Sequence, residues 1–459
     1  MIPNSPSRES KRSWIFSCMG LRQDRPLAGV LLICLLVISA GAEARDLRIT
    51  EAIDLALEHD YGVKAAMSDS GAARLEYAAA RARRFPSLSI EARSSRKDEI
   101  PSLDLEPLGI SREIGSEEIH QADATLSLPL FTGGRISGAV RATRETSLAE
   151  AAKVRAQRMG TAYKCRRAYL EMLLAEALVR SAKASLSRLE AIGRDVGQLH
   201  ESGMADSIDI FEAEIASERG RQALAEKLAM REITAANLKS LTGLTDSEAV
   251  HPVDNVEPPA KPLVDALDRS TSSDRPEVDQ LAHMARAAEH AVTVATADNL
   301  PSLAAIAGYS IGMPNQDLFN NDWNDYMMVG VSLTWDFNLG GATVRTRSAA
   351  RERARSARLM EEDLLERLAL QREIAVESAQ RSYATMEHTG RQLKLARRRF
   401  ALAEERQRAG LLSVNRLIEM EDDLQSLEEQ YRASIIDCYL AETDYFYSMG
   451  STRIYGGLR

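Results

Sequence analysis

Apolar and polar residues alternate along four short stretches of the chain. In the first stretch, Leu88 and Ile90 lie on one side of an extended chain, and Ser89 and Glu91 lie on the other. This period of two predicts a strand with one apolar face and one wet face. The same pattern predicts four strands in all, at residues 87–94, 121–128, 303–309 and 329–337.

Roughly nine to eleven residues are enough for a tilted strand to cross a bilayer. Alternation is a weak signal for each segment, so a small soluble sheet between helices is the alternative. If the strands do cross a membrane, four are too few to close a barrel, because open edges would leave backbone groups unpaired in hydrocarbon. Several copies of the chain would then have to contribute to one barrel.

Helical patterns fill most of the remaining chain. Two long helices are predicted, from Arg135 to His200 and from about Ala342 to Ala409, because neither stretch contains proline. Such helices are about 100 Å long at the usual rise per residue. Apolar residues recur three and four positions apart, as in coiled coils, at Leu189, Ile192, Val196 and Leu199 and at Leu393, Ala396, Phe400 and Ala403. Shorter helices are predicted at 61–84, 204–243, 276–299 and 411–450.

The two halves of the chain share one layout. Glycine landmarks return 207 residues later, with Gly133-Gly134 at Gly340-Gly341, Gly203 at Gly410 and Gly243 at Gly450. Repeats of this length predict a duplicated architecture, and a long-helix protein with fortuitous glycines is the alternative. Each half is predicted to send one unbroken helix away from the strands and to return by two stacked shorter helices. Gly203 and Gly410 mark the reversals, since a left-handed residue commonly ends a helix.

The first residues have the pattern of a secretory signal peptide. Basic residues precede an apolar run from Leu27 to Ile38, and Ala42-Glu43-Ala44 is an A-x-A cleavage site. Either Met1 or Met19 could be the true start. The predicted divisions are a signal peptide at 1–44, a first repeat at 45–244, a connecting equatorial segment at 245–275, a second repeat at 276–450 and a tail at 451–459. In the first repeat, Thr50 is the expected N-cap of a short helix that ends near Asp60.

Composition and charge exclude several functions. Charged residues are 27% and aromatic residues 5% of the 459 residues, which favours extended helices over a thick globular core. A net charge of -9 and the absence of a basic face argue against nucleic acid as a partner. No catalytic constellation, cofactor motif or metal-ligand spacing occurs, so we expect no enzyme and no cofactor. Cys165 and Cys438 are expected as buried thiols, although a disulfide between them is possible.

Several short segments together resemble one known family. They are Phe85-Pro86-Ser87-Leu88, Leu128 to Arg135 with its Thr-Gly-Gly, Leu238 to Gly243 and Arg275 to Val278. In this order, over about residues 47 to 450, they are similar to the TolC-like outer membrane efflux protein family. The resemblance implies an α+β membrane fold, with long antiparallel coiled-coil helices in an α-barrel. Four amphipathic strands per chain would contribute to a shared trimeric β-barrel.

The resemblance also implies a function and partners. Members of the family are homotrimers in the cell outer membrane that extend into the periplasm. They are passive exit ducts for tripartite efflux or type I secretion, and they dock on a periplasmic adaptor protein and an inner membrane transporter. The alternative for this chain is a trimeric outer membrane coiled-coil scaffold or adhesin without transport. An adhesin needs its strands at one terminus, whereas these strands are interleaved with helices.

Candidate site residues lie around the two glycine reversals. Gly203, Ser207, Gly410 and Ser413 are expected at the periplasmic tip, where an adaptor would dock. The resemblance places acidic residues three apart at a closed tip, and the matching positions here are Arg416 and Glu419, with Asp209 and Glu212 in the first half. These four are candidates for a pore constriction, and ordinary charge on a helix surface is the alternative. Arg416 replaces one of the two carboxylates, so the sequence departs here from the double acidic ring that the resemblance implies.

Overall fold

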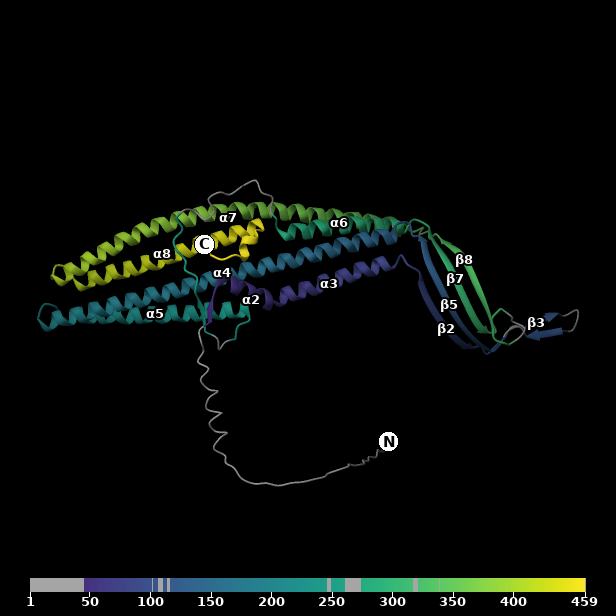
Figure 1. Ribbon diagram of the computed structural model, residues 1–459, viewed down its shortest axis with the longest axis horizontal. Coiled ribbons are helices and arrows are strands. Elements are labelled where there is room, and N and C mark those ends of the chain that lie inside the picture. The colour runs from purple at the N-terminus through teal and green to yellow at the C-terminus, as the bar shows by residue number, and fades with distance from the viewer. Residues whose placement is uncertain are drawn as a thin grey trace, which may run out of the picture.

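A computed structural model describes residues 45–100, 102–105, 110–113, 116–245, 249–260, 274–316, 321–337 and 339–458. The predicted signal peptide at 1–44 lies outside these residues, as do parts of the predicted connecting segment at 245–275. The chain forms a long helical body with a β-sheet at one end (Figure 1).

The helices of the two halves have matching lengths. The long helices α4 (Arg135–Glu201) and α7 (Ala342–Arg408) have 67 residues each, and the returning helices α5 (Ser207–Thr242) and α8 (Val414–Met449) have 36 each. Helices α3 (Tyr61–Ala82) and α6 (Pro276–Ala297) have 22 residues each. The duplicated layout predicted from the glycine spacing is therefore confirmed. Two short helices, α2 (Ile49–His59) and the 3₁₀ helix η2 (Thr452–Tyr455), complete the described helices.

Helix packing differs between the two ends of the body. Next to the sheet, α4 lies between α3 and α6, and α7 packs on α6. Towards the far end, α5 packs on α4, α4 on α8, and α8 on α7. The open edges are thus α3 and α7 near the sheet, and α5 and α7 at the far end. No helix in the described ranges is long and apolar enough to span a membrane.

The main sheet has four antiparallel strands in the order β2-β5-β7-β8. Their bounds are β2 Ser87–Arg96, β5 Glu118–Phe131, β7 Ser302–Met313 and β8 Asn324–Thr334. The register places Leu88 opposite Leu126 and Leu126 opposite Ala307, so one face is apolar across the sheet. All four predicted strands are present, but the last ends at Thr334, so Trp335 and Phe337 follow it. Strands β2 and β8 are the sheet edges.

Two small sheets were not predicted. Strands β3 (Ser102–Leu105) and β4 (Ile110–Glu113) pair as a hairpin within a stretch predicted as loop. Strand β1 (Arg45–Leu47) pairs in parallel with β6 (Val250–Pro252). The predicted cap at Thr50 was wrong, because α2 begins at Ile49, two residues before the start that this cap implies. The Ile49 N–H donates to Asp254 Oδ2 at 2.8 Å. A carboxylate from the connecting segment therefore supplies the cap.

The core at mid-height is apolar and contains both cysteines as free, buried thiols. Burial raises the pKa of Cys165 to about 12 and that of Cys438 to about 11. The two thiols are therefore protonated and unreactive at neutral pH. The disulfide that the sequence left open is not formed.

Candidate functional site: the helical tip and the polar joint

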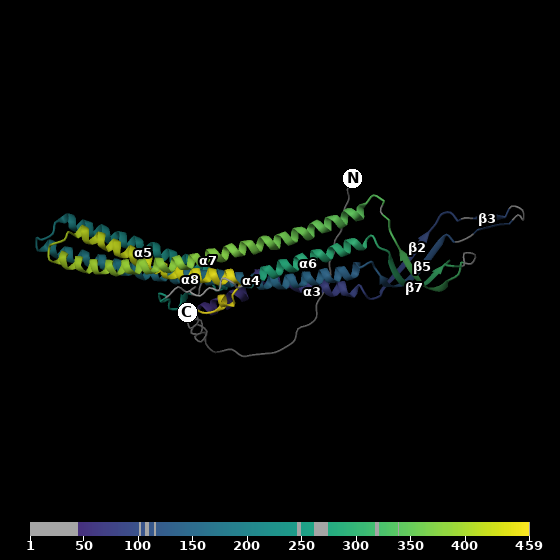
Figure 2. The ribbon, with the colours of Figure 1, turned by 90° about the horizontal axis from the view of Figure 1, so that it is seen from above.

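Both helical hairpins reverse at the end of the body far from the sheet (Figure 2). Gly203 and Gly410 have φ of 73° and 70°, a left-handed conformation that costs other residues roughly 1–2 kcal/mol. Each glycine N–H donates to a carbonyl of the last helical turn, His200 or Gln407, at 2.9 Å. The next N–H reaches one residue further back, which is a Schellman closure. The predicted reversals at both glycines are confirmed.

The helices that leave the turns have different caps. Asp206 accepts hydrogen bonds from Ile208 and Asp209 N–H at 2.7 and 3.0 Å, and Asp209 Oδ2 accepts from the Asp206 N–H at 3.3 Å. Ser413 caps α8 by accepting from the Arg416 N–H at 3.4 Å. Ser207 is instead the first residue of α5 and is exposed. Asp206 was not predicted as a cap, although Asp-x-x-Asp before an apolar run is a capping-box pattern.

The four constriction candidates lie in the first turns after these caps, but they do not pair across the hairpins. The Arg416 guanidinium bonds Glu419 on its own helix at 2.5 Å, with the two side chains 57% and 52% exposed. Asp209 is engaged in its capping box, and Glu212 is partly buried on α5. In a single copy, Arg416 is therefore not the residue that ties one hairpin to the other.

An apolar core holds the two hairpins together just above the tip. Its members come from α4, α5, α7 and α8 and include most of the residues predicted from the three-and-four spacing: Leu189, Ile192, Val196, Leu393, Ala396, Phe400 and Ala403. The predicted Leu199 is only partly buried. Val414, Leu417 and Leu424 of α8 complete this face.

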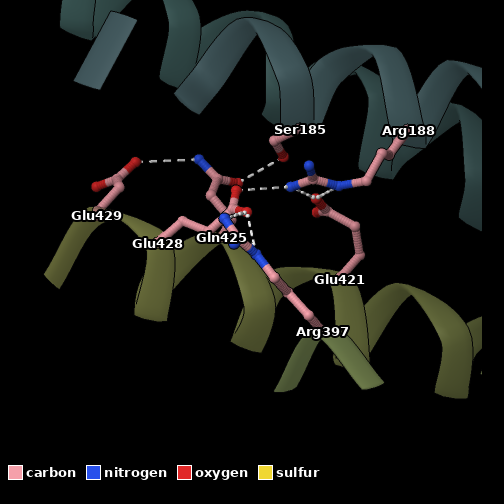
Figure 3. Close-up of polar contacts among 7 residues, drawn as sticks. All are labelled: Ser185, Arg188, Arg397, Glu421, Gln425, Glu428 and Glu429. Carbon is pink, nitrogen blue, oxygen red and sulfur yellow. Dashed lines mark hydrogen bonds and ion pairs between the residues drawn. The ribbon is translucent and has the colours of Figure 1, made fainter. Parts of the chain in front are cut away.

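A polar joint borders this core, because Glu421 lies between the core residues Leu417 and Leu424 along α8; Figure 3 shows the residues around it. Glu421 on α8 is 0% exposed, and its Oε1 accepts from Arg188 of α4 at 3.0 Å from Nε and 2.8 Å from Nη2. Its other oxygen, Oε2, is buried without a hydrogen-bond partner. A buried ion pair of this kind is costly to desolvate and more costly to break.

The joint extends from α8 to the other three helices. Glu428 receives Arg188 at 3.4 Å and Arg397 of α7 at 2.9 Å (Figure 3). The Ser185 hydroxyl of α4 donates to Gln425 at 2.8 Å, and Lys227 of α5 bonds Glu429 at 2.7 Å. One face of α8 therefore connects α4, α5 and α7 through hydrogen bonds and ion pairs.

The pKa of Glu421 differs from that of an ordinary glutamate. Burial raises its pKa above the ordinary value, although the Arg188 charge, the Ser185 hydroxyl and the Arg188 hydrogen bond each act to lower it, and Asp422 raises it further. Burial is the largest of these effects, and Oε2 is buried without a hydrogen-bond partner.

The sequence of α8 carries a signal for this joint. Val414, Leu417, Glu421 and Leu424 follow alternating three- and four-residue steps. Glu421 therefore occupies a position that a coiled-coil pattern reserves for apolar residues. A carboxylate there predicts a buried partner, which Arg188 supplies.

The comparisons with known proteins agree with this architecture. The family model described as outer membrane efflux protein matches residues 52–244 and 269–432. The chain belongs to this family. It is therefore an outer membrane protein that extends into the periplasm, and the resemblance found in the sequence is confirmed. Family and structural neighbours are channels rather than enzymes. Among the described residues, no group of His, Cys, Asp and Glu could hold a metal ion.

Several solved structures share the fold of this efflux family member. VceC from Vibrio cholerae is 16% identical, with 88% of this chain and 96% of that chain covered and a TM-score of 0.75. The Campylobacter jejuni CmeC channel is 15% identical, with 90% of each chain covered and a TM-score of 0.75. The open state of Neisseria gonorrhoeae MtrE is 18% identical, with 88% and 89% covered and a TM-score of 0.70. No curated protein sequence matches significantly.

Proposed function

We propose that this protein is the outer membrane exit duct of a tripartite efflux or type I secretion system. It would passively conduct substrates from a periplasmic adaptor and an inner membrane transporter to the exterior. Family membership supports the channel role, and the two helical hairpins that reverse far from the sheet supply a docking end. The proposed divisions are repeats at 45–244 and 276–450, the connecting segment 245–275 and the tail 451–459.

The proposal of a shared barrel rests on the unpaired edges of the sheet. Strands β2 and β8 each leave one row of backbone groups unpaired, and most apolar side chains on the sheet are exposed, such as Ile90 at 76% and Val329 at 76%. In a bilayer such edges must be paired. Three copies would bring β8 of one chain beside β2 of the next and close a twelve-stranded homotrimeric barrel against outer membrane lipid.

The far end of the helical body offers a matching seam. On the edge helix α5, Ile208, Phe211 and Ile215 are 65%, 60% and 53% exposed. On the other edge helix, α7, Leu395 and Leu402 are 66% and 61% exposed. Exposed apolar stripes at helical spacing indicate partner contact. An α5–α7 contact between neighbouring copies would bury both stripes and close the α-barrel.

Trimer formation and conduction are tested together. The purified protein in detergent should have the mass of three chains by native mass spectrometry and should form ion-conducting pores in planar bilayers. A trimer without conductance would favour the scaffold or adhesin instead. A stable soluble monomer would overturn both.

The docking role of the tip is tested with matched variants. Gly203→Trp and Gly410→Trp place bulk at the reversals, where a Cβ meets no atom within 4 Å, so each costs the roughly 1–2 kcal/mol of the left-handed conformation but creates no clash. We expect efflux to be lost while the trimer persists. Gly203→Asn and Gly410→Asn are the controls, because asparagine tolerates the left-handed conformation with little bulk. Normal efflux by the Trp variants would mean that docking occurs elsewhere.

A further inference from the structure

A dense group of arginines lies at the end of α7 nearest the sheet. Between Ala342 and Arg358 the helix carries six arginines and one acidic residue, Glu352, in a chain whose net charge is -9. This local excess of positive charge contrasts with the negative net charge of the whole chain. These arginines lie in the turns of α7 that follow strand β8, where Figure 1 shows that the helical body meets the sheet.

Other arginines lie at the same level, next to α3 and in α4. Helix α3 ends just before Arg83 and Arg84, which precede β2, and Arg141 lies in the second turn of α4, which follows β5. We call Arg83, Arg84, Arg141, Arg345, Arg347 and Arg351 the basic collar. All are exposed except Arg347, which is partly exposed.

The collar arginines, unlike two arginines nearby, have no acidic partner among the described residues. Nearby, Arg135 bonds Asp298 at 2.9 Å, and Arg358 bonds Glu289 at 2.5 Å. Across the ranges that the structure describes, no collar arginine forms an ion pair within the chain. Exposed guanidinium groups without internal partners are available to an external anion.

Aromatic side chains mark the same level as a boundary between lipid and water. Phe85 precedes β2, Phe131 ends β5, and Trp335 and Phe337 follow β8. They are 71%, 50%, 50% and 70% exposed, respectively. Aromatic girdles of this kind flank the apolar band of membrane-spanning strands at the headgroup level. Arg345 and Arg347 are the fourth and sixth residues of α7, so they lie within roughly 10 Å of its start by helical rise.

Assembly would concentrate this charge further. The open helix edges near the sheet are α3 and α7, so three copies would bring the end of α3 in one copy close to the start of α7 in the next. Both edges are basic there, whereas the α5 and α7 edges at the far end also carry the exposed apolar stripes described above. Like charges at such a seam repel unless anions lie between them.

We propose that the basic collar binds the phosphate headgroups of anionic phospholipids in the periplasmic leaflet of the outer membrane. The inference rests on the proposed function, because it takes the four strands to span that membrane. Arginine forks fit phosphate oxygens, and the aromatic girdle places the collar at their depth. Basic residues next to a membrane-spanning segment are attracted to anionic headgroups within about a Debye length.

The test compares lipid retention by matched trimers. The parent protein and the variant Arg345→Gln/Arg347→Gln/Arg351→Gln are reconstituted into vesicles of equal parts phosphatidylcholine and phosphatidylglycerol. Lipids that remain bound after extraction are identified by native mass spectrometry. One charge contact with an anionic surface corresponds to roughly a fivefold change in binding. We therefore expect the parent to retain phosphatidylglycerol preferentially and the variant to lose at least about fivefold of that preference.

Two controls separate charge from position and from folding. The variant Arg367→Gln/Lys394→Gln/Arg406→Gln removes the same charge from α7 further from the sheet and should retain the lipid. The variant Arg345→Lys/Arg347→Lys/Arg351→Lys keeps the charge and should restore much of the preference. Equal retention by the parent and the collar Gln variant would overturn the proposal. If the parent itself neither inserts into vesicles nor conducts, the proposed function fails instead.

Discussion

At the scale of single residues, the duplication conceals an asymmetry. Glu214 of α5 and Glu421 of α8 are equivalent positions in the repeat, yet Glu214 is exposed and Glu421 is fully buried. The cause is the packing order, since α8 lies between α4 and α7 whereas α5 packs chiefly on α4. One sequence pattern thus yields a solvated carboxylate in one half and a buried ion pair in the other.

Burial of Glu421 predicts a specific pH dependence. Its pKa is raised in the folded protein, so the folded state holds this proton more tightly than the unfolded state. The stability that Glu421 contributes is therefore complete below the ordinary glutamate pKa and is lost as pH rises through the raised value. Glu421→Gln cannot lose a proton. The melting temperature of this variant should therefore rise relative to that of the parent as pH increases above the ordinary glutamate pKa.

The matched control for this measurement is Glu214→Gln, at the exposed twin position. Its melting temperature should follow the parent at every pH, because an exposed carboxylate has nearly the same proton affinity folded and unfolded. A difference between Glu421→Gln and the parent that does not change with pH would show that Glu421 does not titrate in this range.

At the scale of helices and strands, the sequence predicted what depends on local periodicity. Glycine reversals at Gly203 and Gly410, the long helices and the four strands all follow from spacing along the chain. What it missed depends on contacts distant in sequence. Asp254 caps α2 from about two hundred residues away, and Arg188 of the first helical hairpin bonds Glu421 of the second. Neither partner can be found from the local sequence of the helix that it contacts. Glu421 occupies a position of α8 where the pattern expects an apolar residue, which shows only that some partner is needed.

The joint between α4 and α8 is tested by removing its charges singly and together. Arg188→Met leaves Glu421 buried without its cation and should cost about 3 kcal/mol of stability. Arg188→Met/Glu421→Leu removes both charges and should recover most of that loss, because apolar residues can replace a buried pair. Denaturant or thermal unfolding of the trimer measures both effects. If the double variant is as unstable as Arg188→Met, the joint depends on its wider network with Glu428 and Arg397.

At the scale of the whole molecule, threefold assembly would convert charges at the tip into rings. Arg416 is the third residue of α8, the same position that Asp209 holds in the capping box of α5. A carboxylate is favoured there by the helix dipole and the cap. Arg416→Asp should therefore leave the fold intact, and loss of the exposed Arg416–Glu419 pair should cost at most about 1 kcal/mol.

The effect of Arg416→Asp is expected in the pore. The variant replaces three arginines at the tip by three aspartates. Together with the three copies of Glu419, these would form two acidic rings related by the threefold axis. Cation preference, measured as the reversal potential in planar bilayers under a salt gradient, should rise relative to the parent. Arg416→Gln is the control and should give an intermediate value, because it removes the positive ring without adding a negative one. An unchanged reversal potential in both variants would place Arg416 away from the lumen and direct the search for the constriction to Asp209 and Glu212.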